Sequence, residues 1–355
     1  MAGQSTTRAG DRIARLVQQR FLWLLLACYL LATFWPSPGT ALREWRGAPA
    51  ISGEAPLVPL LLLALMLFCA ALLTDVSQIR IVLRRPVVLG VALVAVWLGP
   101  AALVAAAGWI VPWAVNGQAT AGLLVGLALV AAMPVANSSV GWIQNSDGNL
   151  ALGLALVVSS ILLSPLVTPH LLGLLGTSLS PGEQDLCRRL VDTFSGWFFI
   201  VWVILPTAAG MVCRNLAKPD RIAPIGSWVA LASGAALLLL NYMNSAQALP
   251  KVRESPMALL VAAATLAVAL SLVGLALGWG VARLLGLSRD TQFALLFGLS
   301  MKHTGLALIL AGAVLVDQPL AILIIVLATL LQHLVAGIVQ WRMQRFDAAP
   351  QVTSP

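Results

Sequence analysis

Ten stretches of mostly apolar residues, each long enough to cross a membrane, constrain this chain more than any other feature. A membrane-spanning helix needs about 20 such residues, and no short alternating strands typical of outer-membrane barrels occur between them. With hydrophobic residues at 60% and charged residues at 10% of 355, a soluble domain, a disordered chain and a nucleic-acid-binding protein are excluded. The sequence therefore predicts an all-α polytopic membrane protein. The stretches cover roughly residues 21–36, 56–74, 86–110, 119–145, 148–176, 190–213, 222–246, 256–285, 290–315 and 317–341.

The basic residues predict how the chain is oriented in the membrane. The net charge is +8, from 21 Lys and Arg against 13 Asp and Glu. With ten spans and the N-terminus inside, fourteen cations fall on the cytoplasmic side, six outside, and Lys302 within a span. This bias predicts cytoplasmic N- and C-termini in the inner (plasma) membrane. The N-terminal segment resembles a signal peptide but has no A-x-A cleavage pattern, so we expect it to remain as the first helix.

The two halves of the chain match at an offset of 170 residues, although each match alone could be coincidental. The first span begins near 21 and the sixth near 191, and Pro86 and Pro256 open corresponding spans. Each copy would hold five spans, an odd number, so the second copy would be inverted, as in many secondary transporters. The expected organisation is a tail at 1–20, a first repeat at 21–176, a second repeat at 190–341 and a tail at 342–355.

Two spans in matching places carry helix-breaking and polar residues near their middle. In the fourth, Pro134 removes a backbone donor and small polar residues follow it. Such a break is tolerable only where the backbone is buried in protein or lines a cavity. In the ninth, Lys302 lies about twelve residues into the span, where a charge costs at least ~2.5 kcal/mol. Snorkelling therefore explains Lys302 poorly, whereas hydrogen bonding between helices could explain the fourth span. The polar candidates are Asn137, Ser138, Ser139, Ser300, Lys302, His303 and Thr304.

Residues 134–169 and 296–308 resemble the bile acid:sodium symporter family. The resemblance consists of a proline-led break, then Gly148-Asn149-Leu-Ala-Leu, then Ser164-Pro165-Leu-Val-Thr168-Pro169, and Thr304-Gly-Leu-Ala in the ninth span. It implies ten helices in two inverted repeats, with the broken fourth and ninth helices crossing. It also implies a panel domain (spans one, two, six and seven) and a core domain (the rest), with substrate bound between them.

The family's sodium ligands are mostly missing. The resemblance places three of them in the ninth span, at Gly298, Lys302 and His303, where the family has a glutamate, a glutamine and an asparagine. The remaining positions correspond to Ser139, Val140, Gly153 and Val157, of which only Ser139 has a ligand-type side chain. Because a Lys ammonium beside sodium would be repelled without an acidic mediator, we expect no two-sodium coupling.

Lys302 therefore has two competing roles. Its ammonium could replace a sodium ion by binding freed carbonyls of the broken helices, and its proton could couple transport to a proton gradient. Alternatively, it could be the counter-ion of an anionic substrate, helped by half-helix N-termini. His303 is a candidate proton relay or a packing residue. Cavity-lining or packing roles are both open for Asn241, Asn244, Gln332 and His333.

The expected function is secondary transport of a small, anionic organic solute across the lipid bilayer by alternating access. The alternatives are a conventional sodium-coupled bile-acid-type symporter, a non-transporting sensor on a transporter fold, and a metalloid exporter, which would have a cysteine in the fourth span. No enzyme motif, cofactor motif or clustered metal ligands are present, so we expect no catalytic residue, no cofactor and no metal site.

Overall fold

The computed structural model describes residue 17 and residues 20–45, 57–73, 86–114, 120–194, 200–217, 222–252 and 255–348. Within these residues the chain is helical apart from turns, short breaks and one isolated β-bridge. The helices are α2 (Phe21–Phe34), α3 (Ser37–Glu44), α5 (Leu57–Leu73), α7 (Pro86–Ala114), α8 (Ala121–Ala132), α9 (Ser138–Asn145), α10 (Leu150–Thr177), α11 (Pro181–Phe194), η2 (Ile200–Ile204), α13 (Leu205–Leu216), η3 (Ala223–Ile225), α15 (Gly226–Val252), α16 (Met257–Leu284), α17 (Arg289–Ser300), α18 (Thr304–Val314) and α19 (Pro319–Ala348).

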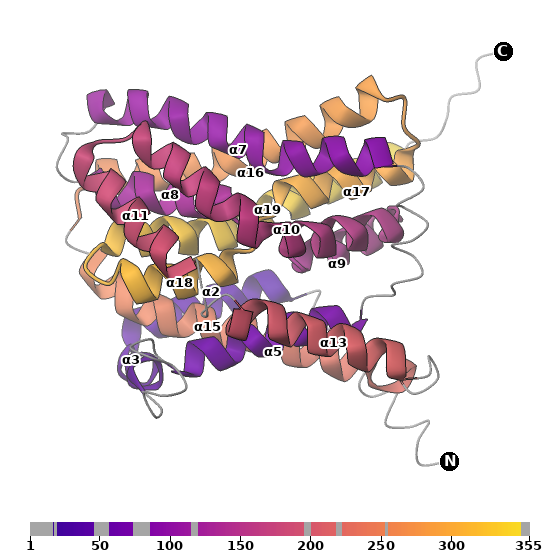
Figure 1. Cartoon of the computed structure of the whole chain (residues 1–355), viewed down its shortest axis with the longest axis horizontal. Helices are drawn as coiled ribbons and strands as arrows, with labels where there is room; N and C mark the ends of the chain where they lie inside the picture. Colours follow the sequence, from indigo (N-terminus) through magenta and orange to yellow (C-terminus); the bar gives the residue numbers. More distant parts are fainter. Residues whose placement is uncertain are drawn as a thin grey trace.

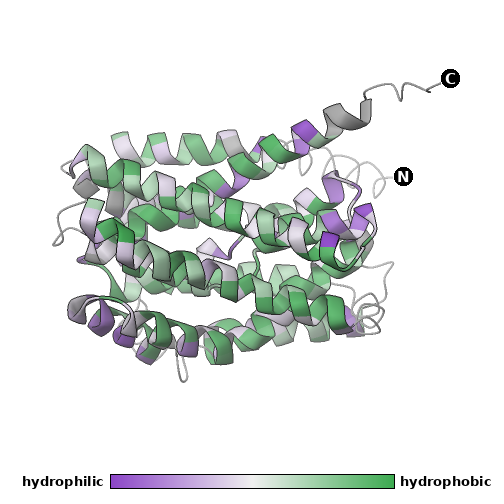
Figure 2. Ribbon diagram, turned by 90° about the horizontal axis from the view of Figure 1, so that it is seen from above, coloured by the Kyte–Doolittle hydropathy of each residue, from purple (hydrophilic) through white to green (hydrophobic). Residues whose placement is uncertain are grey.

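The described helices form a polytopic membrane protein. Five of them, α7, α10, α15, α16 and α19, are long and apolar enough to cross a bilayer, and a sixth span arises if the bent pair α2–α3 counts as one. Four further apolar helices have 10–17 residues. Figure 2 shows hydrophobic residues along most of the helix surfaces, and large apolar side chains such as Trp113 (92% exposed) face outward. Lipid is the solvent that such a surface requires.

The first apolar segment ends close to its predicted boundary and then turns sharply. α2 stops at Phe34, before Trp35-Pro36, as expected because a residue preceding proline avoids helical geometry. The next helix, α3, lies at 94° to it. The sequence did not predict α3, which carries the buried side chain of Arg43.

Residue 190, where the sequence predicts that the sixth span starts, lies inside α11 (Pro181–Phe194). Residues on either side of that point belong to α11, which is amphipathic: Cys187 and Leu190 are buried, whereas Asp185 and Arg189 form an exposed ion pair at 3.0 Å. Charged residues on one face suit a surface helix better than a lipid-exposed one. Among the described residues, the next apolar helical segment includes η2 from Ile200. The match between 21 and 191 therefore pairs the start of α2 with the interior of α11.

The helices pack in two groups that meet at α15. In the first group α15 packs against α2, α3 and α5, and α5 packs against α13; Figure 1 shows these helices along the lower side. In the second group α16 packs against α7, α17 and α19, and α8 packs against α7, α10 and α19. α15 also contacts α18 and α19, so it forms much of the junction between the groups.

Many basic residues behind the predicted orientation lie outside the described residues, so the orientation stays a prediction. They are Arg8, Arg12, Arg15, Arg46, Arg80, Arg84, Arg85, Lys218, Arg221 and Arg253.

Candidate functional site

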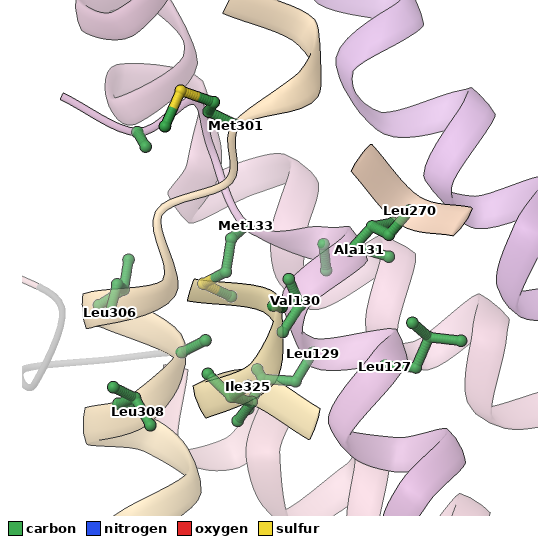
Figure 3. Packing of buried hydrophobic residues seen from close by; sticks show 14 of the residues in the cluster. Leu127, Leu129, Val130, Ala131, Met133, Leu270, Met301, Leu306, Leu308 and Ile325 are labelled. Carbon is green, nitrogen blue, oxygen red and sulfur yellow. The ribbon is translucent and has the colours of Figure 1, made fainter. Parts of the chain in front are cut away.

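Two interrupted helices cross in the interior of the second group. α8 ends at Ala132 and α9 begins at Ser138, while α17 ends at Ser300 and α18 begins at Thr304. The two extended breaks pair as an antiparallel bridge between Val135 and Lys302. Two backbone bonds close it, from Ala136 N to Met301 O at 3.0 Å and from His303 N to Pro134 O at 2.9 Å. Figure 3 shows Met301 and Met133 on the two breaks, with Leu306 where the helix resumes.

The sequence dictates where each helix stops. Pro134 has no N–H to donate to the carbonyl of Val130, which accepts instead from Met133 N at 3.1 Å. On the other segment the side chain of His303 caps α18, its Nδ1 accepting from Leu306 N at 3.2 Å. Each break therefore exposes helix-end polar groups in an apolar interior, where each requires a partner.

The side-chain amine of Lys302 supplies partners at the end of α8. Lys302 is 2% exposed. Its Nζ donates to Ala131 O at 3.0 Å, to Met133 O at 3.1 Å and to Val96 O. An ammonium has three N–H donors, so these carbonyls use all of them. A cation here also faces the negative end of the α8 dipole.

A proline in α7 explains why the carbonyl of Val96 is available. In an α-helix this carbonyl would accept from the N–H of residue 100, but residue 100 is Pro100, inside α7. The missing donor leaves Val96 O free for the amine of Lys302. A further carbonyl at the end of α8, Ala132 O, accepts from Trp97 Nε1 at 3.1 Å and from Thr168 Oγ1 at 2.8 Å.

The backbone of the crossing is held from both sides. Gln332 on α19 pairs with Lys302 like a neighbouring strand: its Oε1 accepts from Lys302 N at 3.0 Å and its Nε2 donates to Lys302 O at 3.4 Å. On the opposite break, Val135 N donates to Ser160 Oγ at 3.0 Å. The crossing is thus a rigid, buried hydrogen-bonded unit.

The other predicted polar candidates are close to the crossing but differ in their contacts. Ser139 Oγ donates to Ala136 O at 2.8 Å and Ser300 Oγ to Phe297 O at 3.4 Å, so both hydroxyls bond within their own segment. Thr304 is 2% exposed, and Ser138 is half-buried. In contrast, both amide atoms of Asn137 and the Nε2 atom of His303 are buried without a hydrogen-bond partner, which makes them available to a ligand.

His333 lies on α19 beside the crossing. Its Nδ1 accepts from Trp142 Nε1 on α9 at 3.1 Å, and its ring meets Phe21 of α2 edge-on at 5.1 Å. Its Nε2 is buried without a partner. His333 therefore sits where α2 of the first group touches α9 and α19 of the second.

Asn241 and Asn244 lie on α15 with both side chains buried. Asn241 Oδ1 accepts from Tyr29 Oη at 3.1 Å. Asn244 Oδ1 accepts from Arg43 Nη1 at 3.3 Å. Arg43 is a buried cation on α3, a helix that the sequence did not predict.

Four of the positions that the resemblance assigns to sodium ligands, Gly298, Val140, Gly153 and Val157, are packed with hydrocarbon. A Cβ at Gly298 would lie 3.0 Å from Leu156 Cδ1, and one at Gly153 would lie 2.5 Å from Ile143 Cδ1. Val157 is 3% exposed and Val140 packs against the core cluster. These side chains offer no oxygen ligand. Among the described residues, no three His, Cys, Asp or Glu side chains come together as a metal site.

Comparison with known proteins identifies the family. A family model described as the SBF-like CPA transporter family (DUF4137) matches residues 19–345. The chain is also similar to the Uncharacterized protein YbaS of Bacillus subtilis (strain 168), with 24% identity over 230 residues, which are 64% of this chain and 71% of that relative. Because this family model matches nearly the whole chain, the membrane protein belongs to the SBF-like CPA transporter family.

Proposed function

We propose that this family member is a secondary transporter that moves a small organic anion by alternating access. Its ten spans would be α2, α5, α7, α8–α9, α10, η2–α13, α15, α16, α17–α18 and α19, arranged as two inverted repeats. The antiparallel bridge between two broken helices supports this topology. The two helix groups would be the panel (with α2, α5, α13 and α15) and the core, and the contacts of α15 with both support this division.

The single observation that carries the mechanism is the coordination of the Lys302 amine by three carbonyls. We propose that this ammonium takes the place of a sodium ion and holds α7, α8 and the α17–α18 break together. The positive charge is supplied covalently, so no sodium needs to bind. Leu156 and Ile143, which fill the space beside Gly298 and Gly153, support the same conclusion.

The geometry favours this role over that of a substrate counter-ion. All three donors of the Lys302 ammonium face backbone carbonyls, so none is left for an anion. The unpartnered atoms of Asn137, His303 and His333 are better candidates to bind the solute. They lie around the crossing, and α9 and α18 begin there, so positive helix ends would contribute to anion binding.

Uptake into proteoliposomes tests the proposal. A panel of radiolabelled organic anions would be offered with a sodium gradient and a pH gradient imposed separately. Transport that is independent of sodium and retained by Lys302→Arg but lost in Lys302→Ala is expected for a fixed cation. Uptake driven by the sodium gradient would refute it. Proton-driven uptake lost in both variants would instead assign Lys302 a titrating role in proton coupling.

The same proposal places the protein in the inner (plasma) membrane with both termini cytoplasmic. Cysteines introduced one at a time into the two termini and labelled with an impermeant maleimide in intact and permeabilised cells would test this. Labelling of either terminus in intact cells would contradict it.

A further inference from the structure

Arg43 joins three helices at the junction between the two groups. It is 4% exposed. From α3, its Nε donates to Gln247 Oε1 at 2.6 Å and its Nη1 to Asn244 Oδ1 at 3.3 Å, both on α15. Its Nη2 donates to Gly312 O, on α18, at 2.7 Å. One guanidinium therefore bonds the first group to the second.

The acceptors of Arg43 are neutral, so the attraction depends on geometry and on the helix end. Gly312 is in the last turn of α18, where carbonyls lack intrahelical partners and the helix dipole is negative. Two side-chain acceptors on α15 stay with Arg43 in the first group, whereas the carbonyl of Gly312 and the dipole of α18 compensate the buried charge only while the groups are in contact. Separation of α15 from α18 would let water solvate the guanidinium, which reduces the cost of breaking these bonds.

Gly312 provides the space that this contact needs. A Cβ at this position would lie 2.0 Å from Arg43 Nη2 and 2.8 Å from Cζ, well inside van der Waals contact. Any larger residue at 312 must displace the guanidinium. The contact can therefore be broken from the α18 side without changing Arg43.

A second hydrogen-bonded link lies on the same face of α15. Tyr29 Oη contacts both Asn241 Oδ1 at 3.1 Å and Val326 O of α19 at 3.2 Å. Asn241 and Asn244 are three residues apart, so they lie on one helix face. Deeper on this face, Leu240 approaches Gly305 in the first turn of α18: a Cβ built at Gly305 would lie 3.6 Å from Leu240 Cδ2.

We propose that Arg43 is a gating residue, a positioning residue that holds α15 against α18 in this conformation and must release Gly312 when that side opens. The gate rests on the proposed alternating access. It predicts that weakening the Arg43–Gly312 contact shifts the resting population toward a state in which the α15–α18 face is open to water, without substrate or any ion being present.

Cysteine accessibility tests the gate. In a chain with its four native cysteines changed to alanine, Leu240→Cys would report on the α15–α18 face and Ala155→Cys on the interior of the core; both side chains are fully buried. The rate of labelling with a hydrophilic maleimide would be measured in nanodiscs. Arg43→Ala and Gly312→Ala should each accelerate labelling of Leu240→Cys about tenfold and leave Ala155→Cys unlabelled. Arg43→Lys, which keeps the charge, should give a smaller increase.

The control is Arg188→Ala, which removes an exposed arginine of α11 and should leave both rates within twofold of the parent. If either Arg43→Ala or Gly312→Ala labels Leu240→Cys at the parent rate, the gate is refuted. If Ala155→Cys becomes reactive as well, Arg43 merely maintains the fold, and the proposal is equally refuted. Labelling needs no transported solute, so the outcome is separate from success or failure of the uptake experiments.

Discussion

Removing the amine of Lys302 should destabilise the protein in a way that a small cation can repair. In Lys302→Ala, the carbonyls of Val96, Ala131 and Met133 lose their common donor. Each buried unsatisfied group costs about 1–3 kcal/mol, which gives about 3–9 kcal/mol. The ammonium no longer has to be desolvated, which returns several kcal/mol. We expect a net loss of about 2–5 kcal/mol, or a fall in Tm of the order of 5 °C or more.

The informative comparison is with Lys302→Met. Alanine leaves a cavity beside three carbonyls, whereas methionine fills the space of the lysine stem and provides no donor. Ethylammonium or sodium can therefore enter the first variant and not the second. Thermal unfolding of purified protein in sodium chloride, ethylammonium chloride and choline chloride measures this. Sodium and ethylammonium should raise the Tm of Lys302→Ala by several degrees relative to choline, and leave Lys302→Met and the parent unchanged.

Two results would refute the reasoning. Equal rescue of Lys302→Ala and Lys302→Met would mean that the cation acts elsewhere on the protein. A Lys302→Ala variant as stable as the parent in choline chloride would mean that the amine does not serve as an internal cation, whatever its contacts.

Three further predictions concern the partners of the crossing. Pro100→Ala should restore a helical N–H donor to Val96 O, which Lys302 otherwise uses as an acceptor. A double-mutant cycle with Lys302→Met, measured by thermal unfolding, should therefore show about 1–2 kcal/mol of coupling. Additive effects of the two substitutions would contradict a shared acceptor. Thr168→Val removes one of the two hydrogen bonds to the buried Ala132 O, and Trp97 Nε1 keeps the other, so it should cost about 0.5–1.5 kcal/mol; the exposed Thr177→Val is the matched control and should be nearly neutral. Gln332→Leu leaves the backbone N–H of Lys302 unpaired, whereas Lys302 O keeps its bond from Thr304 N at 2.8 Å, and it should cost about 1–3 kcal/mol; a Tm equal to the parent's would show that water replaces the amide.

The breaks between α8 and α9 and between α17 and α18 were predictable because they follow from single-residue chemistry. Pro134 cannot donate to the preceding turn, and Lys302 cannot lie in mid-span without partners. The sequence therefore located the crossing at both sites. The resemblance to a known family supplied the pairing of one break with the other, which separate spans cannot reveal.

Other contacts could not be predicted, because they join segments far apart in the chain. Pro100 is recognisable in the sequence as a proline inside an apolar helix, and the unpaired carbonyl of Val96 follows from it. The contact between this carbonyl and Lys302 does not follow from the local sequence. Arg43 has no such signal, since a short helix after Trp35-Pro36 reads as a polar loop. The predicted sixth span started inside α11 because hydrophobicity averaged over a window conceals an amphipathic helix.

Lys302 and Arg43 bind at different places relative to the junction between the two helix groups, and the proposed motion at this junction would separate their roles. The carbonyl partners of Lys302 belong to α7, α8 and the break that follows α8, all in the second group, so rigid-body motion between the groups leaves them intact. Arg43 bonds α15 of its own group and Gly312 of α18 in the other group. The same motion must therefore break the hydrogen bond from Arg43 to Gly312 O. The free-energy difference between the conformations should therefore depend on the Arg43–Gly312 contact, which is made in only one of them. The crossing around Lys302 should move as a unit. Gly312→Ala should therefore alter the balance of conformations without lowering the Tm of the core, whereas Lys302→Ala should lower the Tm and leave that balance unchanged.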